Sequence, residues 1–338
     1  MEYTAKKLLV ISCMSSLAFL GGCASYKIEN FDAYSQTTMP QADVMPSVEE
    51  LKNKKTKIVV FNADDSNIDL AKNAKAGYSI ATTLEKHLSE AGTEIVDRNI
   101  AKKLQNEIQL AEVKGKSTYQ GPSIADYAIT GNVSAANIGS KFYERSQWTD
   151  KKGKVYVTPA KCKYTAQVTA NLKIYKLPGL AFSKSVSIDD SVSVSEETRN
   201  SNCPYSVNAQ ESLVRQAAAA AVNDSRTEFQ NYFAPKAYVI ERRINEDKNI
   251  FKLSRGTDAG FKTGSSVKFY NLEINKNPLT QEVSTEESSV VEGNVSDKVG
   301  KKHAWVIVDE VEKAGKVRLG DYVKITYEKG FLEGLPSF

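Results

Sequence analysis

Histidine is scarce in this 338-residue sequence, which contains only two. His87 lies in an amphipathic helical pattern and His303 precedes an apolar strand-like run, and neither has a second ligand at metal-binding spacing. We therefore predict that both are surface or boundary residues. No phosphate-binding glycine loop, GxGxxG or GxSxG motif stands in the context that its chemistry needs. The sequence predicts no enzyme, no cofactor and no metal centre.

Paired carboxylates and tryptophans are the other candidates for chemistry. Asp64-Asp65 and Asp189-Asp190 could act as acid–base or calcium groups, but each pair follows a strand-like run in a turn-prone stretch. We predict capping or solvated turn roles for both pairs. Trp148 is a candidate contact for a partner, whereas Trp305 is predicted to lie in a core.

A strong charge imbalance is also missing. The formal net charge is +4, and removal of Lys6, Lys7 and Glu2 with a leader would lower it to +3. A nearly neutral chain lacks the concentrated basic face that nucleic acid requires, so no nucleic-acid partner is predicted. No run beyond the leader is apolar for long enough to span a membrane as a helix.

The first residues have the pattern of an export signal. Lys6 and Lys7 precede a mostly apolar run over residues 8–20, which is shorter than a membrane span. The next residues, Leu20-Gly21-Gly22-Cys23, resemble the lipobox of bacterial lipoproteins, which implies a signal peptide over 1–22 and a lipid on Cys23. The alternative is an ordinary cleaved signal with a chance cysteine. Because Ala24 replaces the aspartate typical of inner-membrane retention, the resemblance implies anchoring in the outer membrane, facing the periplasm.

Two cysteines remain once Cys13 leaves with the signal and Cys23 is lipidated. Cys162 and Cys203 would enter an oxidising compartment, where a disulfide could form. Two unpaired buried thiols are the alternative. Metal binding is disfavoured because neither CxxC spacing nor a histidine accompanies the pair.

The chain beyond the leader divides into three parts. Residues 23–56 have few periodic apolar positions and are predicted to be a tether. Residues 57–234 alternate strand-like and helical patterns, as in "KIVVFNA" and "GYSIATTLEKHLSEAG", which predicts an α/β domain. A long hairpin ("KYTAQVTANLKIYKL" and "AFSKSVSIDDSVSVS") and an alanine-rich helix over 209–233 complete it. The run Ala217–Ala221 is predicted to allow close packing on the sheet.

Residues 235–338 are predicted to form a small β-barrel. Gly264–Phe269 and Gly320–Ile325 match in register, each placing a glycine turn before a strand that contains Val-Lys. Closure of such strands into a barrel would hide their edges. Between the repeats, the polar residues 274–302 are predicted to be a mobile loop.

The order of these patterns is similar to the periplasmic domain shared by the curli secretion lipoprotein CsgG and the TolB N-terminal domain. The matching features are "KIVVFNA", "TEIVDRN" with Asp97-Arg98, and Ala125-Asp126-Tyr127 leading to Gly131. The C-terminal region resembles the SH3-like domain of FlgT-type flagellar assembly proteins. These resemblances imply non-enzymatic envelope assembly or transport, with envelope protein partners and a homo-oligomer as a further option.

Three functions remain open: a scaffold in an envelope machine, a CsgG-type secretion channel, and a regulator that reaches an inner-membrane peptidoglycan synthase through the tether. Membrane-inserting hairpins of the channel type need long apolar strands. The candidate segment 143–161 carries Lys151, Lys152 and Lys154 at its centre, and residues 196–206 are short and polar. Both are predicted to be solvated, which disfavours the channel. Loops 141–161 and 274–302 are the candidates for partner contact, with variable solvated connections as the alternative, and the sequence identifies no particular partner.

Overall fold

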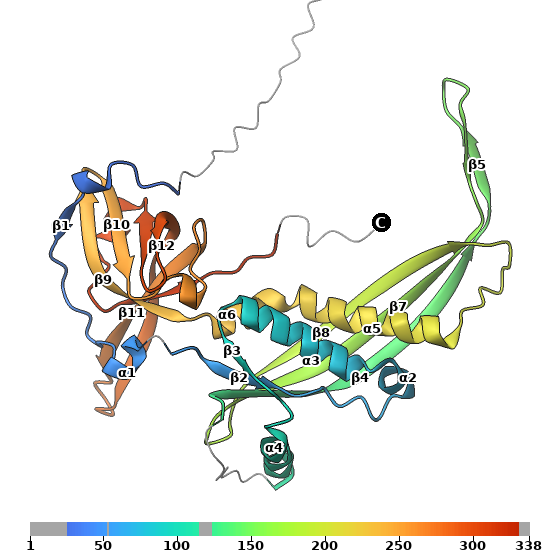
Figure 1. The fold of residues 1–338 in the computed structure, drawn as a ribbon, viewed down its shortest axis with the longest axis horizontal. Helices are drawn as coiled ribbons and strands as arrows, with labels where there is room; N and C mark the ends of the chain where they lie inside the picture. Colours follow the sequence, from blue (N-terminus) through green and yellow to red (C-terminus); the bar gives the residue numbers. More distant parts are fainter. Residues whose placement is uncertain (1–25, 53, 115–123, 331–338) are drawn as a thin grey trace, which may run out of the picture.

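The computed structural model describes residues 26–52, 54–114 and 124–330. It has a mixed α and β architecture dominated by sheet (Figure 1). Residues 57–234, called the first half, contain a five-stranded sheet and a separate two-stranded hairpin, and residues 235–330, called the second half, form a seven-stranded sheet together with residues 35–37. Cys23 and the proposed leader over residues 1–22 lie outside the described residues. None of the helices in the described part is both long and apolar enough to cross a membrane.

The first half contains a five-stranded sheet in the order β3-β2-β4-β7-β8. The strands are β2 (Lys57–Val60), β3 (Glu94–Val96), β4 (Tyr127–Tyr143), β7 (Lys161–Lys176) and β8 (Ala181–Glu197). β2 runs parallel to β3 and β4, whereas β4, β7 and β8 form long antiparallel ladders. The predicted alternation of strands with helices is confirmed here, since parallel pairs need such crossovers.

Helices cover both faces of this sheet at its parallel end. α2 (Asp69–Ala74), α3 (Ala76–Glu90), α5 (Val207–Asp224) and α6 (Arg226–Phe233) share one face, and α4 (Lys102–Lys114) covers the other. Ile58 and Val60 therefore pack with α3 and α5, while Val59 packs with Leu104 of α4. This double coverage explains why β2 is a continuous apolar run instead of an alternating one.

The alanine-rich helix packs as the sequence predicts. Ala217, Ala218 and Ala221 are fully buried in the core that α5 forms with β7 and β8. The predicted single helix is divided, because Ser225 leaves helical geometry with φ −91° and ψ 2°. α6 thus begins as a separate short helix that leads into the second half.

The second half contains a seven-stranded sheet in the order β1-β9-β10-β13-β12-β11-β14. Its strands are β1 (Ser35–Thr37), β9 (Lys236–Asn245), β10 (Lys248–Leu253), β11 (Ser266–Lys276), β12 (Val283–Val299), β13 (Ala304–Val308) and β14 (Tyr322–Ile325). β14 also pairs with β9. Each strand in the series β9, β10, β13, β12, β11 and β14 therefore pairs with the next, and the last pairs with the first. The remaining short helical elements are η1 (Phe31–Ala33), α1 (Val48–Leu51), η2 (Thr257–Ala259) and α7 (Val311–Ala314).

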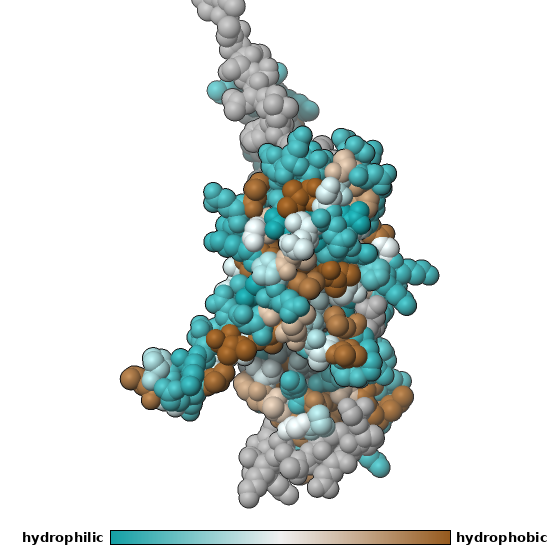
Figure 2. Space-filling model, turned by 90° about the vertical axis from the view of Figure 1, so that its left-hand side faces the viewer, coloured by the Kyte–Doolittle hydropathy of each residue, from teal (hydrophilic) through white to brown (hydrophobic). Residues whose placement is uncertain are grey.

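Both glycine turns of the internal repeat have the expected geometry. Gly264 and Gly320 have φ values of 82° and 93°, a region that disfavours side chains with a Cβ. The strands that follow them, β11 and β14, pair with each other, and Val267 faces Ile325. On the outer surface of this half, viewed in Figure 2, exposed apolar residues (brown) stand between hydrophilic ones (teal).

The predicted mobile loop over 274–302 is wrong. β11 continues to Lys276 and β12 begins at Val283, so most of this segment is a ladder with only a short turn between the strands. Its outer part extends beyond the core and both of its faces are exposed, with Leu279 at 92% exposure. A strand that is exposed on both faces needs no alternation of apolar and polar residues, and this alternation is the sequence pattern from which strands are predicted. Without it, the segment was predicted to be a loop.

The predicted tether over 23–56 is also wrong for its described part. β1 pairs with β9, and Ile28 and Tyr34 are buried against Trp305 and Ile250. Further along, a capping box links Ser47 and Glu50 at the start of α1. The segment folds back onto the second half because its few apolar residues fill gaps there, without the periodicity of a long element.

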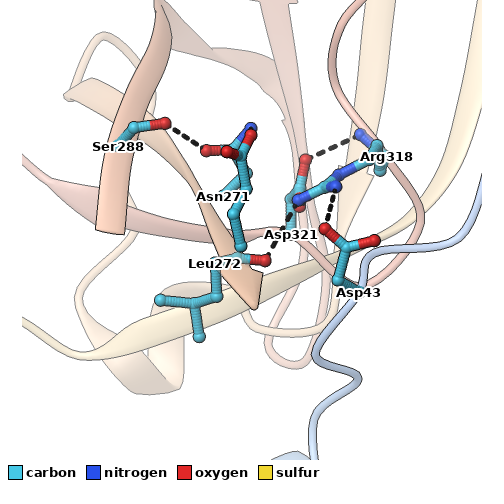
Figure 3. Close-up of polar contacts among 7 residues, drawn as sticks. Asp43, Asn271, Leu272, Ser288, Arg318 and Asp321 are labelled. Atoms are coloured by element: carbon cyan, nitrogen blue, oxygen red, sulfur yellow. Dashed lines mark hydrogen bonds and ion pairs between the residues drawn. The ribbon is translucent and has the colours of Figure 1, made fainter. Parts of the chain in front are cut away.

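An arginine network fastens this segment to the second half (Figure 3). Arg318 contacts Asp43 at 3.0 Å and Asp321 at 3.3 Å, and its Nη2 donates to the carbonyl of Leu272 at 3.3 Å. The Asp321 side chain is completely buried, and burial raises the pKa of its carboxyl even though Arg318 acts in the opposite direction. Nearby, Ser288 donates to Asn271 across the β11–β12 ladder. Arg318 is thus the cation that neutralises a buried carboxylate.

The two halves also contact each other directly. Asn231 of α6 donates to the carbonyl of Tyr327 at 2.9 Å and accepts from its backbone N–H at 2.8 Å. Asp224 forms an ion pair with Lys329 at 2.7 Å. These polar contacts, rather than a shared apolar core, hold the α6 end of the first half to the second half.

A candidate partner-binding arm and the disulfide at its base

The β4–β7 ladder continues beyond the helices into a solvent-exposed arm. The arm consists of β5 (Ser146–Thr149) and β6 (Val155–Thr158), which pair with each other and with no other strand. Every residue of both strands is exposed. Figure 1 shows the arm projecting from the end of the molecule opposite the second half. The segment 143–161, which was predicted to be a solvated loop, is therefore largely exposed, but it forms a paired hairpin.

Aromatic and apolar side chains are displayed on the arm. The rings of Trp148 and Tyr156 stack at 4.4 Å, and Val155 and Val157 are about half exposed, at 51% and 50%. Lys154 lies 5.0 Å from the Tyr156 ring, which adds a cation–π contact. A hairpin with exposed apolar groups can offer them to a partner without rearrangement of the core. The prediction of Trp148 as a contact residue fits this exposure.

A tight turn fixes the tip of the arm. Asp150 Oδ1 accepts hydrogen bonds from the backbone N–H groups of Lys152 and Lys154, both at 2.9 Å. Gly153 supplies a φ of 79° between them. The three lysines that the sequence places here therefore surround a turn in solvent, as predicted.

A disulfide between Cys162 and Cys203 lies at the base of the arm, which confirms the predicted pair. The Cα atoms are 5.6 Å apart and 41 positions separate the two cysteines in the sequence. Beside the disulfide, the rings of Tyr164 and Tyr205 stack at 3.9 Å, and the Tyr164 hydroxyl donates to the carbonyl of Pro204 at 3.0 Å. The bond therefore attaches the loop after β8 to the first residues of β7.

The histidines do not share a site. His87 lies between helices, with Nε2 2.7 Å from Asn223 Oδ1 and Nδ1 3.3 Å from Glu90. His303 is exposed just before β13. His87 therefore makes a structural contact between α3 and α5. Within the described ranges, no three His, Cys, Asp or Glu side chains are grouped as metal ligands would be.

The two carboxylate pairs differ in their surroundings. Asp64 accepts from the backbone N–H of Ser66, and Asp65 accepts from that of Gly77, so both cap backbone groups as predicted. The turn predicted for Asp189-Asp190 is wrong, because both lie within β8 opposite Thr169 and Val168. The serine-rich composition around them is that of an exposed strand face, and it resembles a turn in sequence alone.

A cavity between the two halves was not predicted. It has a volume of about 520 Å³, and its lining includes Tyr127 and Tyr232 from the first half and Lys236, Arg255 and Lys324 from the second. These residues come from strands and helices far apart in the sequence, and no local pattern joins them. The one available signal was the Val-Lys match of the internal repeat, which contains Lys324.

Comparison with known proteins finds no matching family model and no matching curated protein. Among solved structures, a minor lipoprotein from Acinetobacter baumannii is 12% identical, with 52% of this chain and 92% of that chain covered and a TM-score of 0.24. Lipoprotein GNA1162 from Neisseria meningitidis is 16% identical, with coverage of 50% and 96% and a TM-score of 0.22. The PelC dodecamer from Paraburkholderia phytofirmans is 13% identical, with coverage of 56% and 95% and a TM-score of 0.20. Likeness at this level carries no argument about function.

Proposed function

We propose that the protein is a non-enzymatic lipoprotein of the outer membrane that faces the periplasm and serves as a scaffold, assembly or transport component of a cell-envelope machine. The observation that carries the assembly role is the arm, whose aromatic and apolar side chains are held in solvent by an ordered hairpin. The lipid anchor rests on Leu20-Gly21-Gly22-Cys23, and the disulfide fits an oxidising compartment. The CsgG/TolB-N-like and SH3-like resemblances of the two halves belong to this proposal.

Loss of the lipid anchor tests the proposed location. We expect Cys23→Ser to move the protein from the outer-membrane fraction of a sucrose gradient to the soluble periplasmic fraction, because a folded chain without the lipid lacks its membrane attachment. Cys13→Ser is the matched control, since it changes a cysteine within the same leader. Retention of Cys23→Ser in the outer-membrane fraction would contradict the proposal.

Changes in the arm test the assembly role. We expect a Trp148→Ala, Val157→Ala variant to change the free energy of unfolding by less than about 1 kcal/mol for each substitution, because both side chains are exposed and Trp148 contributes a single cross-strand stack with Tyr156. The same variant should fail to replace the wild-type protein in a strain that lacks it. A control with Lys262→Ala, an exposed position in the second half, should replace it fully. Full function of the arm variant would remove the arm from the proposal.

The mass of the lipidated protein in detergent separates this proposal from a channel. Light scattering coupled to size exclusion should give a monomer or a small oligomer for a scaffold. A particle of about eight or more subunits would instead favour the ring that the CsgG resemblance implies.

A further inference from the structure

The cavity between the two halves concentrates positive charge. Four basic residues line it, namely Lys54, Lys236, Arg255 and Lys324, against a single acidic residue, Glu50. None of the four takes part in an ion pair within residues 26–52, 54–114 and 124–330. The lining therefore carries more basic than acidic side chains, although the charges of Glu50 and Glu287 act on Lys236 and Lys324.

Two of these lysines face each other across a strand pair. Lys236 of β9 and Lys324 of β14 are direct partners in the ladder, a placement that is unfavourable for like charges. Burial lowers the pKa of Lys324, and the charge of Lys236 lowers it further. The ring centroid of Tyr322 is 4.2 Å from Lys236 Nζ and 5.7 Å from Lys324 Nζ. A bound anion would relieve this repulsion, which the ring alone does only in part.

Arg255 adds an unsatisfied donor. Its Nη2 donates to the carbonyls of Glu50 and Lys52, both at 3.3 Å, while its Nε is buried without a hydrogen-bond partner. Buried polar groups are normally paired, so an unpaired donor beside a cavity indicates a missing acceptor.

Glu50 does not supply that acceptor. Its carboxylate accepts from the backbone and hydroxyl of Ser47, at 2.9 and 2.8 Å, and from the Tyr238 hydroxyl at 3.2 Å. These hydrogen bonds keep the pKa of Glu50 below its usual value. The hydrogen bonds of the Glu50 carboxylate therefore go to Ser47 at the start of α1 and to Tyr238 in the cavity lining.

We propose that this cavity binds a phosphorylated sugar, with the phosphate against Lys236, Lys324 and Arg255 and the sugar ring against the tyrosine wall. A phosphate offers several acceptor oxygens to lysine and arginine donors. Tyr127 and Tyr232, which also line the cavity, contribute aromatic surface, with their rings edge to face and their centroids 6.4 Å apart. The volume of about 520 Å³ lies within the range typical of small-molecule sites.

Calorimetric titration of the full mature protein with glucose 6-phosphate, inorganic phosphate and glucose tests the proposal. We expect glucose 6-phosphate to bind more tightly than inorganic phosphate, and glucose not to bind measurably. Lys324→Gln should weaken glucose 6-phosphate binding by about tenfold, because a charge-assisted hydrogen bond is lost. Binding should also weaken as salt is raised.

Lys262→Gln is the matched control, since it removes one exposed lysine from the same half of the chain. Thermal unfolding without ligand gives a second measurement, in which Lys324→Gln should be at least as stable as wild type because a like-charge contact is removed. No binding of glucose 6-phosphate, or equal loss in Lys324→Gln and Lys262→Gln, would overturn the proposal. Binding of inorganic phosphate as tight as that of the sugar phosphate would overturn the sugar part.

Discussion

Arg318→Ala is expected to lower the free energy of unfolding of the second half by about 3–5 kcal/mol. The substitution leaves the completely buried Asp321 carboxylate without its cation. It also removes the ion pair to Asp43 and the hydrogen bond to the carbonyl of Leu272. Both the buried charge and the attachment of the N-terminal segment are therefore affected.

Tryptophan fluorescence can follow this unfolding in urea. The chain has two tryptophans, so a Trp148→Phe background leaves Trp305 as the single emitter. Trp305 is buried next to Ile28 and Tyr34 of the N-terminal segment, so its emission reports on the same contacts. Asp43→Asn is the control, because the Asp43 side chain is 50% exposed and its loss should cost less than about 1 kcal/mol.

Two further measurements show whether the buried charge is the cause. Asp321→Asn added to Arg318→Ala should restore part of the stability, since no buried charge remains. The effect of Arg318→Ala should also be smaller at pH 4 than at pH 7. Burial already raises the pKa of Asp321, and loss of the arginine raises it further, so the carboxyl is neutral in acid. A loss no larger than that of Asp43→Asn, independent of pH, would contradict this account.

Replacement of both Cys162 and Cys203 by serine is expected to lower the free energy of unfolding of the first half by about 4 kcal/mol. The disulfide closes a loop with a sequence separation of 41. In the chain-entropy model such a loop falls between the values of about 3 kcal/mol for 15 residues and about 4.7 kcal/mol for 100. Far-UV circular dichroism is a suitable measurement, because the long helices α3 and α5 lie in this half.

Reduction provides an internal control for this variant. A reductant should destabilise the wild-type protein to the level of the serine variant and leave the serine variant unchanged. Hydrogen exchange should increase most in the first residues of β7 and in the loop after β8, which the bond connects. If the oxidised wild type and the variant unfold at the same urea concentration, the bond contributes no net stability.

Local sequence patterns were sufficient to predict the structure where the spacing of the buried residues follows the period of a strand or a helix. The alternation in β7 predicts its buried face, and Ala217 and Ala221 pack on the sheet because small side chains at helical spacing permit close approach. The disulfide was also predictable, because two remaining cysteines in an oxidising compartment tend to pair and no metal-binding spacing accompanies them. These features depend on residues that are near one another in sequence or few in number.

Other features depend on contacts between distant segments. β1 is only three residues long and exists because β9 offers it an edge, so residues 26–52 show no period of their own. The outer part of the β11–β12 ladder is exposed on both faces. It packs against no core, so its sequence needs no alternation of apolar and polar residues. The basic cavity joins α1, β9 and β14, and only their assembly brings Lys236 opposite Lys324.

The attachment of residues 26–52 has a mechanical consequence. Two residues separate Cys23 from Tyr26, a reach of at most about 10 Å, so a lipid on Cys23 would hold the second half close to the bilayer. Any tension between the membrane and a partner on the arm would then enter through the β1–β9 ladder and the Ile28–Asp297 hydrogen bond. Further along the segment, the ion pair between Arg318 and Asp43 would resist the same force. With the lipid in place, residues 26–52 would therefore transmit such a force to the second half before it reached β2 and the five-stranded sheet.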